Sequence, residues 1–207
     1  MFIWEISVYI KGNRFTVYSP HPNIKDRLER LEMFEFFPVP FKSFTATIDF
    51  AEMKGKSDLR NGDVKISWKE MYHPGKSFAY RVGYKEKSVV YATDAEYKKL
   101  GPEDLKPTVD FFKDVDVFIF DVQYTFSEGL EKEDWGYSST FIGVNLAVEA
   151  KVKKIIFYHH EPTYTDFKLR EIFRQTEKYL KLVGSNSPLK FDLASEGMMI
   201  DLMQGRS

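Results

Sequence analysis

Apolar and polar residues alternate with period two in several segments, which predicts half-buried β-strands. Such strands are expected over 14–19 and around 45–50, and the clearest alternation follows in 64–69 and 78–85. Residues 88–93 and 115–120 are instead continuous apolar runs, as expected for strands covered on both faces. The charged segment 54–61 is expected to be an exposed loop.

Helical spacing of apolar residues predicts helices between these strands. Asn23 is expected to cap a short helix with Leu28 and Leu31 on one face. Residues 141–150 have helical spacing and precede a strand over 154–158. Thr165 or Asp166 then begins a long amphipathic helix that ends at Gly184, and two strand-like pieces, 191–194 and 198–202, follow. This alternation predicts an α/β fold, a sheet layered with helices.

Composition narrows the function classes. With 207 residues, of which 43% are hydrophobic, the chain is expected to form a single domain over 1–207. Its net charge of −1 gives no general attraction to nucleic acid or to an anionic membrane. It contains no cysteine, so His, Asp and Glu are the available metal ligands, and disulfides are excluded.

Targeting and nucleotide-binding signals are absent from the sequence. No apolar run reaches the roughly 20 residues that span a bilayer, and residues 1–6 lack the basic start of a signal peptide. A cytoplasmic protein that does not contact membranes is therefore expected. The sequence also lacks a glycine-rich phosphate loop, which disfavours a nucleotide-binding module.

Four acidic or histidine residues occupy equivalent places, at or just after the ends of expected strands. They are His73, Asp94, Asp121 and His159, and functional groups of α/β sheets gather at such ends. Each has an ordinary alternative as a turn, cap or hydrogen-bonding residue. A carboxylate after a buried strand, however, needs a cation or several donors. Alternation directs one histidine of the His159-His160 pair toward the site; we favour His159 and keep His160 as the alternative.

Short strings around these residues form an ordered set. They are Tyr72-His73-Pro74-Gly75, Thr93-Asp94-Ala95-Glu96, Asp121-Val122-Gln123-Tyr124, Trp135-Gly136-Tyr137-Ser138-Ser139 and Tyr158-His159-His160-Glu161-Pro162. In this order they resemble the metallo-β-lactamase-fold hydrolases, in the branch of the phosphodiesterases and tRNA 3′-processing enzymes. The resemblance implies an αββα sandwich and a dinuclear site of Zn, Mn or Fe. It also implies hydrolysis of a phosphoester or phosphodiester bond in a small phosphate ester or a nucleotide-type substrate.

The resemblance also implies roles for single residues. His73 corresponds to a ligand of the first metal, Asp94 to the aspartate that bridges both metals, and His159 to a ligand of the second. Asp121 corresponds to an acidic residue that supports a proton-transferring histidine, and Tyr137 occupies that histidine's place. A tyrosine, with a reference pKa of about 10, is a poorer proton shuttle at neutral pH. The expected catalytic residues are Asp94, Asp121 and Tyr137.

One element of the family pattern is absent from the sequence, the His-X-His-X-Asp-His motif that supplies four further ligands. The expected fold is therefore N-terminally truncated and incomplete in its N-terminal half, with a metal site that is empty or partly occupied. A homo-oligomer or a complementing N-terminal fragment is expected to cover the apolar face that this leaves. Two functions follow: a hydrolase completed by residues from elsewhere, or a catalytically inactive scaffold that acts by oligomerisation or partner binding.

Overall fold

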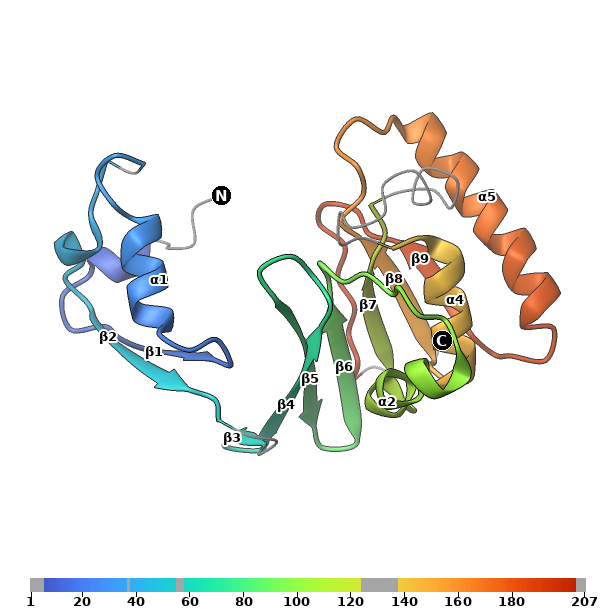
Figure 1. Ribbon diagram of the computed structural model, residues 1–207, viewed down its shortest axis with the longest axis horizontal. Helices are drawn as coiled ribbons and strands as arrows, with labels where there is room; N and C mark the ends of the chain where they lie inside the picture. The colour runs from blue at the N-terminus through green and yellow to red at the C-terminus, as the bar shows by residue number, and fades with distance from the viewer. Residues whose placement is uncertain (1–5, 37, 55–57, 124–137, 204–207) are drawn as a thin grey trace. The chain divides into compact units, whose positions relative to one another are not determined.

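The computed structural model in Figure 1 describes residues 6–36, 38–54, 58–123 and 138–203. The chain forms two compact units, Met1–Ser57 and Asp58–Ser207. Each unit has its own sheet, one of two strands and one of seven. The single domain expected over residues 1–207 stays a prediction.

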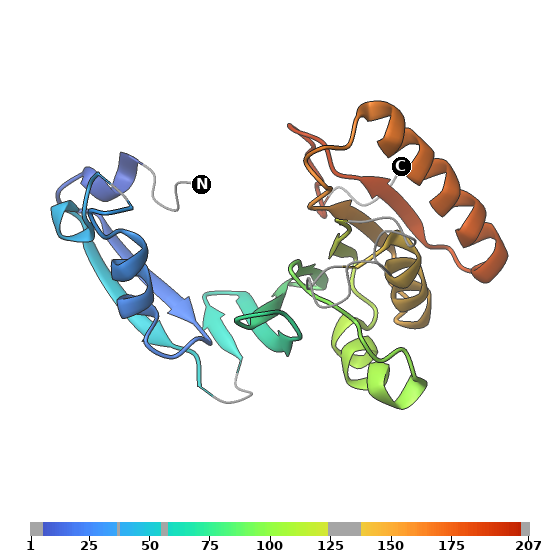
Figure 2. The same ribbon diagram turned by 45° about the horizontal axis from the view of Figure 1, so that its top comes forward.

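The first unit is a β-α-β arrangement. Strands β1 (Arg14–Ser19) and β2 (Thr47–Glu52) pair in parallel, and helix α1 (Ile24–Leu31) connects them. Figure 2 shows α1 alongside the strand pair. Asn23 precedes α1 in the left-handed region, with φ of 54°, but its side chain makes no capping hydrogen bond. Two short 3-10 helices, η1 (Ile6–Tyr9) and η2 (Phe41–Ser43), complete the unit.

The second unit is built on a seven-stranded sheet whose strands lie in sequence order, β3 to β9. Strands β3 to β6 are antiparallel to their neighbours, whereas β6 to β9 are parallel. The strands are β3 (Leu59–Asn61), β4 (Val64–Met71), β5 (Ser77–Tyr84), β6 (Lys87–Ala92), β7 (Val117–Asp121), β8 (Lys154–Tyr158) and β9 (Lys190–Leu193).

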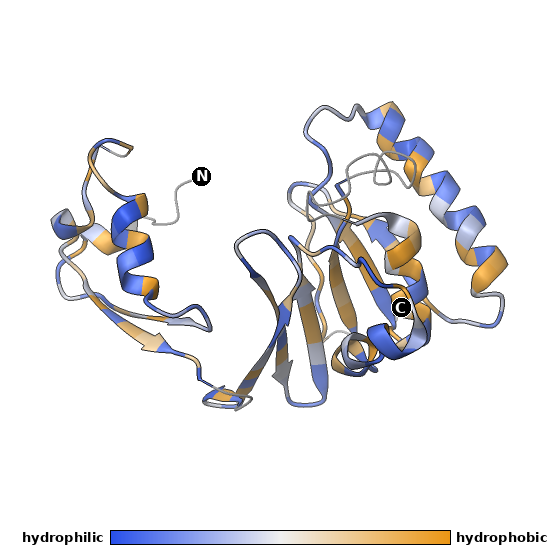
Figure 3. Ribbon diagram, viewed as in Figure 1, coloured by the Kyte–Doolittle hydropathy of each residue, from blue (hydrophilic) through white to orange (hydrophobic). Residues whose placement is uncertain are grey.

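Helices connect the parallel strands, as parallel pairing requires. They are α2 (Pro102–Phe112), α4 (Thr140–Glu149) and α5 (Asp166–Val183). Side chains from α2 and α4 pack on one face of the sheet with Phe118, Phe120 and Phe157, which are fully buried. Figure 3 shows the hydrophobic residues gathered on β7 and β8. None of the described helices is long and apolar enough to cross a membrane.

The α/β class is confirmed, and most elements agree with the sequence patterns. Strands β1 and β8 have the predicted bounds. The long helix begins at Asp166, and the side chain of Thr165 caps it by accepting a hydrogen bond from the Lys168 N–H.

Three expectations about elements were wrong or incomplete. Residues 198–202 form no strand, and the segment expected as a loop over 54–61 contains β3. Helix α2 was not predicted, although Pro102 at its first position and Glu103 and Asp104 in its first turn are typical of a helix start. Pro107 lies inside the helix and interrupts the helical pattern.

Candidate metal centre

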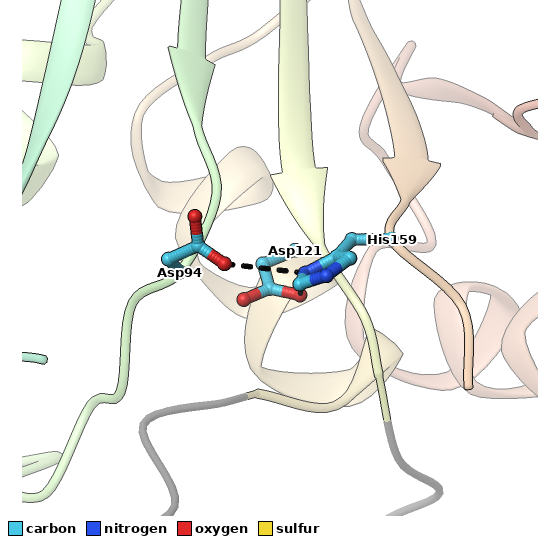
Figure 4. A group of neighbouring side chains, drawn as sticks. All are labelled: Asp94, Asp121 and His159. Atoms are coloured by element: carbon cyan, nitrogen blue, oxygen red, sulfur yellow. Dashed lines mark ion pairs between the residues drawn. The ribbon is translucent and has the colours of Figure 1, made fainter. Parts of the chain in front are cut away.

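Three neighbouring parallel strands bring Asp94, Asp121 and His159 to one edge of the large sheet. Asp94 lies two residues after β6, Asp121 is the last residue of β7, and His159 directly follows β8. Each residue offers one potential ligand atom, and these atoms lie within 4.8 Å of one another. Figure 4 shows the three side chains converging at the strand ends.

The two distances from His159 to the carboxylates fit a shared cation. His159 Nδ1 lies 3.4 Å from Asp94 Oδ1 and 3.3 Å from Asp121 Oδ1. A charge-assisted N–H···O hydrogen bond is shorter, about 2.7–2.9 Å. A tetrahedral ion with bonds of about 2.0–2.2 Å separates its ligand atoms by about 3.3–3.6 Å. The observed distances therefore agree better with ligands of one ion than with direct hydrogen bonds.

Burial of the Asp121 side chain also favours a bound cation at this site. This side chain is fully buried, whereas the side chains of Asp94 and His159 are 46% and 38% exposed. Asp121 Oδ2 accepts a 3.4 Å hydrogen bond from the Ala95 N–H. Among the described residues, no donor is in hydrogen-bonding geometry with Asp121 Oδ1. Because a buried carboxylate oxygen without a donor is costly, and carboxylate and imidazole groups bind divalent ions, the residues fit a metal ion.

Electrostatics link protonation at this site to metal binding. Burial raises the pKa of Asp121, although the neighbouring His159 opposes this shift. The adjacent Asp121 carboxylate raises the pKa of His159, and burial opposes this shift only in part. Histidine binds a metal in its neutral form, so an incoming ion must displace a proton that Asp121 helps His159 to retain.

Two residues of the group hold a strained backbone. Asp94 and His159 have φ of 54° and 61°, in the left-handed region. This region costs a non-glycine residue about 1–2 kcal/mol, although Asp and His tolerate it better than most. Strained residues of this kind concentrate at functional sites.

Comparisons with known proteins identify the fold. No protein-family model and no curated protein matches the chain. Among solved structures, YhfI from Bacillus subtilis, a metallo-β-lactamase fold protein, aligns with a TM-score of 0.62 and 17% identity, over 89% of this chain and 64% of its own. The chain has the metallo-β-lactamase fold.

Two further structures with high TM-scores agree. Yeast PDE1 aligns with a TM-score of 0.67 and 13% identity, over 92% of this chain and 61% of its own. The short form of human tRNase Z aligns with a TM-score of 0.60 and 12% identity, over 90% of this chain and 66% of its own. The chain thus spans between 61% and 66% of the length of these three structures. The fold predicted from the resemblance is confirmed.

The other site residues expected from the metallo-β-lactamase resemblance are placed differently. His73 follows β4 at the same edge of the sheet, but it is not a member of the group. Because β5 separates β4 from β6 and neighbouring strands lie about 4.8 Å apart, β4 and β6 are roughly 10 Å apart. A ligand role for His73 stays a prediction. Tyr137 lies outside the described residues, so its predicted role also stays a prediction.

His159 and His160 differ in their distance from the two carboxylates, and the ligand role of either stays a prediction. His159, not His160, faces the two carboxylates. Burial lowers the pKa of His160. Asp121, expected behind the ligands, has a carboxylate oxygen within 4.8 Å of the potential ligand atoms of Asp94 and His159. Its predicted role stays a prediction. Its position at the end of a continuous apolar strand was the signal for a buried carboxylate that needs a cation.

Proposed function

We propose that the chain is a metal-dependent hydrolase of phosphoester bonds and that Asp94, Asp121 and His159 hold one divalent ion. The observation that carries this proposal is the pair of distances from His159 Nδ1 to the carboxylates, 3.4 Å and 3.3 Å. Zn, Mn and Fe all accept such a ligand set. Catalytic zinc sites commonly use three protein ligands and keep a fourth position for water.

The fold supports the substrate class. Structures that share it include a tRNase Z and a diphosphatase of the PhnP family, the latter with a TM-score of 0.50 and 12% identity over 90% of this chain. These names favour a phosphate ester as the substrate. The partial exposure of Asp94 and His159 would let such a substrate approach the site.

The residues of the group have different tasks in this proposal. When bound, a divalent ion lowers the pKa of a water molecule and stabilises negative charge on phosphoryl oxygens. Buried Asp121 orients His159. Asp121 also accepts a hydrogen bond from the Ala95 N–H, which fixes Asp121 relative to the Asp94 turn. His159 would hold the ion as a neutral imidazole, without its proton on the coordinating nitrogen. Asp94, on the exposed side, supplies the second carboxylate. The dinuclear site expected from the sequence needs ligands beyond these three.

Metal content and turnover test the proposal together. The chain is stripped with a chelator, incubated with Zn²⁺ or Mn²⁺, and assayed for bound metal and for hydrolysis of bis(p-nitrophenyl) phosphate. We expect one ion per chain, metal-dependent turnover, and loss of both in Asp94→Asn and His159→Gln.

Asp192→Asn is the matched control. Asp192 is also an acidic residue at a strand of the parallel part of the sheet, but it pairs with Lys154 at 2.6 Å and lies outside the group. This variant should bind metal like the wild type. A wild-type chain that binds no metal, or the same metal content in D94N, would refute the assignment.

A scaffold that pairs with a second copy of the chain is the alternative function. On the sheet face opposite the helices, Tyr84, Tyr91 and Tyr158 are 39%, 42% and 45% exposed. Large aromatic side chains are usually less accessible on a sheet face, and exposed apolar patches mark interaction sites. Light scattering of the wild type and Tyr91→Glu distinguishes the cases: this alternative requires a wild-type dimer that the substitution dissociates, and a wild-type monomer rejects it.

A further inference from the structure

Asp94 needs support from outside its own strand, because its left-handed backbone is unfavourable and it projects beyond the end of β6. Hydrogen bonds from several segments of the described chain reach the turn Asp94-Ala95-Glu96. The Ala95 N–H donates to Asp121 Oδ2 at 3.4 Å, and the Glu96 N–H donates to the Tyr72 carbonyl at 3.0 Å. Both backbone donors that follow Asp94 are therefore used.

Two serine hydroxyls use the carbonyl groups of the same turn. Ser77 Oγ, at the start of β5, donates to the Asp94 carbonyl at 2.6 Å. Ser138 Oγ, close to the start of α4, donates to the Ala95 carbonyl at 3.0 Å, and Ser138 is only 4% exposed. These bonds join segments 17 and 43 residues away in sequence to the turn.

We propose that Ser77 and Ser138 are positioning residues that hold Asp94 in its left-handed conformation and so aim its carboxylate at His159 and Asp121. The Ser77 bond acts on the strained residue itself. The Ser138 bond acts on the next peptide, whose N–H contacts Asp121. Together they fix the Asp94 turn relative to the ligand at the end of β7.

This inference rests on the proposed metal site only for its effect on metal affinity. The effect on the Asp94 turn can be tested without a metal ion. Outer partners of metal ligands typically change metal affinity by about 10–100-fold when they are removed. The first readout is amide hydrogen exchange at Ala95 and Glu96 in the metal-free chain, which reports on the turn whether or not an ion binds. The second readout is the dissociation constant for Zn²⁺.

The decisive variants are Ser77→Thr and Ser77→Val, because threonine and valine have nearly the same shape and differ in the hydroxyl group. Losing one hydrogen bond should speed exchange at Ala95 and Glu96 in S77V by about 2- to 12-fold relative to S77T. Zn²⁺ should bind S77V about tenfold more weakly than S77T. Ser138→Ala should act in the same direction.

Ser187→Ala is the control, since Ser187 Oγ is also half-buried and bonded to a backbone group, the Leu189 N–H, outside the group. It should change neither readout. Equal exchange rates and equal Zn²⁺ affinities in S77T and S77V overturn the inference. If wild-type chain binds no Zn²⁺, the proposed function fails, and the exchange rates alone decide whether the serines hold the turn.

Discussion

Gly143→Ala tests whether the packing beneath the candidate metal centre is as tight as the structure indicates. A Cβ at Gly143 in α4 would lie 2.7 Å from Phe120 Cδ1, 2.8 Å from Phe120 Cε1 and 2.8 Å from Phe157 Cε1. Favourable carbon–carbon contacts are about 3.5–4.0 Å. The rings or the helix must therefore move by roughly 0.7 Å or more, in a core where both phenylalanines are fully buried.

The expected destabilisation follows from two opposing effects. Overpacking a core typically costs about 1–3 kcal/mol, and three short contacts favour the upper half of that range. Replacing glycine with alanine inside a helix returns about 1 kcal/mol. The net loss should be about 1–2 kcal/mol, which lowers Tm by about 2–8 °C in a chain of this size. Because Phe120 precedes Asp121 directly, Zn²⁺ should also bind more weakly.

Urea denaturation of Gly143→Ala, Phe157→Leu and the double variant checks this reasoning. If the rings cause the loss, the smaller leucine relieves the contact, and the double variant should be at least about 0.5 kcal/mol more stable than additivity predicts. A G143A chain as stable as the wild type, or strictly additive effects, would show that α4 does not contact these rings as described.

Three further predictions concern charge and buried hydroxyls. Burial would raise the pKa of Asp116, but the Lys153 ammonium at 2.8 Å, the Ser88 N–H and the Lys87 charge outweigh it and lower the pKa below 3.8. The ionised Asp116 therefore stabilises the folded state above pH 3.8, and this stabilisation is lost as the pH falls below that value. In urea titrations, Asp116→Asn should cost about 1–3 kcal/mol at neutral pH and much less at pH 2. The raised pKa of His159 makes stability depend on pH in the opposite direction. Its contribution to the stability of the metal-free chain is present below pH 6.5 and is lost as the pH rises through the folded pKa. Zn²⁺ affinity should increase as the pH rises through the folded pKa of His159, with proton release, measured by calorimetry in buffers of different ionisation enthalpy, and a pH-independent affinity would contradict this. Thr176→Val removes a buried hydroxyl that is 2.8 Å from both Thr140 Oγ1 and the Ile172 carbonyl, so it should cost about 1–3 kcal/mol in urea, while Thr176→Ser should cost less.

Local patterns predicted elements well where one clear signal was present. The strand Lys154–Tyr158 is a short apolar run with well-marked ends, and α5 has both an amphipathic face and a capping threonine. Sequence patterns failed where local signals conflict, or where pairing with another strand decides whether a segment is a strand. Pro107 obscured α2, and residues 198–202 are mostly apolar but pair with no described strand. A strand exists only through hydrogen bonds to a neighbour, which a local pattern does not contain.

In the candidate metal centre, too, some features were predictable from the sequence and others were not. Sequence reasoning found Asp94 and His159 because each follows a strand, and the structure brings both together. The sequence offered His73 as a further ligand, and β5 separates its strand β4 from β6. The close approach of Asp121 Oδ1 to His159 Nδ1, at 3.3 Å, could not be read from the sequence. The metal-site roles of both residues stay predictions.

The resemblance of its motifs to the metallo-β-lactamase family pointed to the fold. The sequence by itself also determined the α/β alternation and the acidic and histidine residues at the ends of its strands. These are local properties, set by hydrophobic period, capping residues and chain direction. Tertiary structure alone decided which of those residues meet. Their convergence depends on the order β6-β7-β8 and on the left-handed backbone of Asp94 and His159, with the Asp94 turn held by hydrogen bonds from Ser77 and Ser138. Those contacts join distant parts of the chain, so no local pattern encodes them.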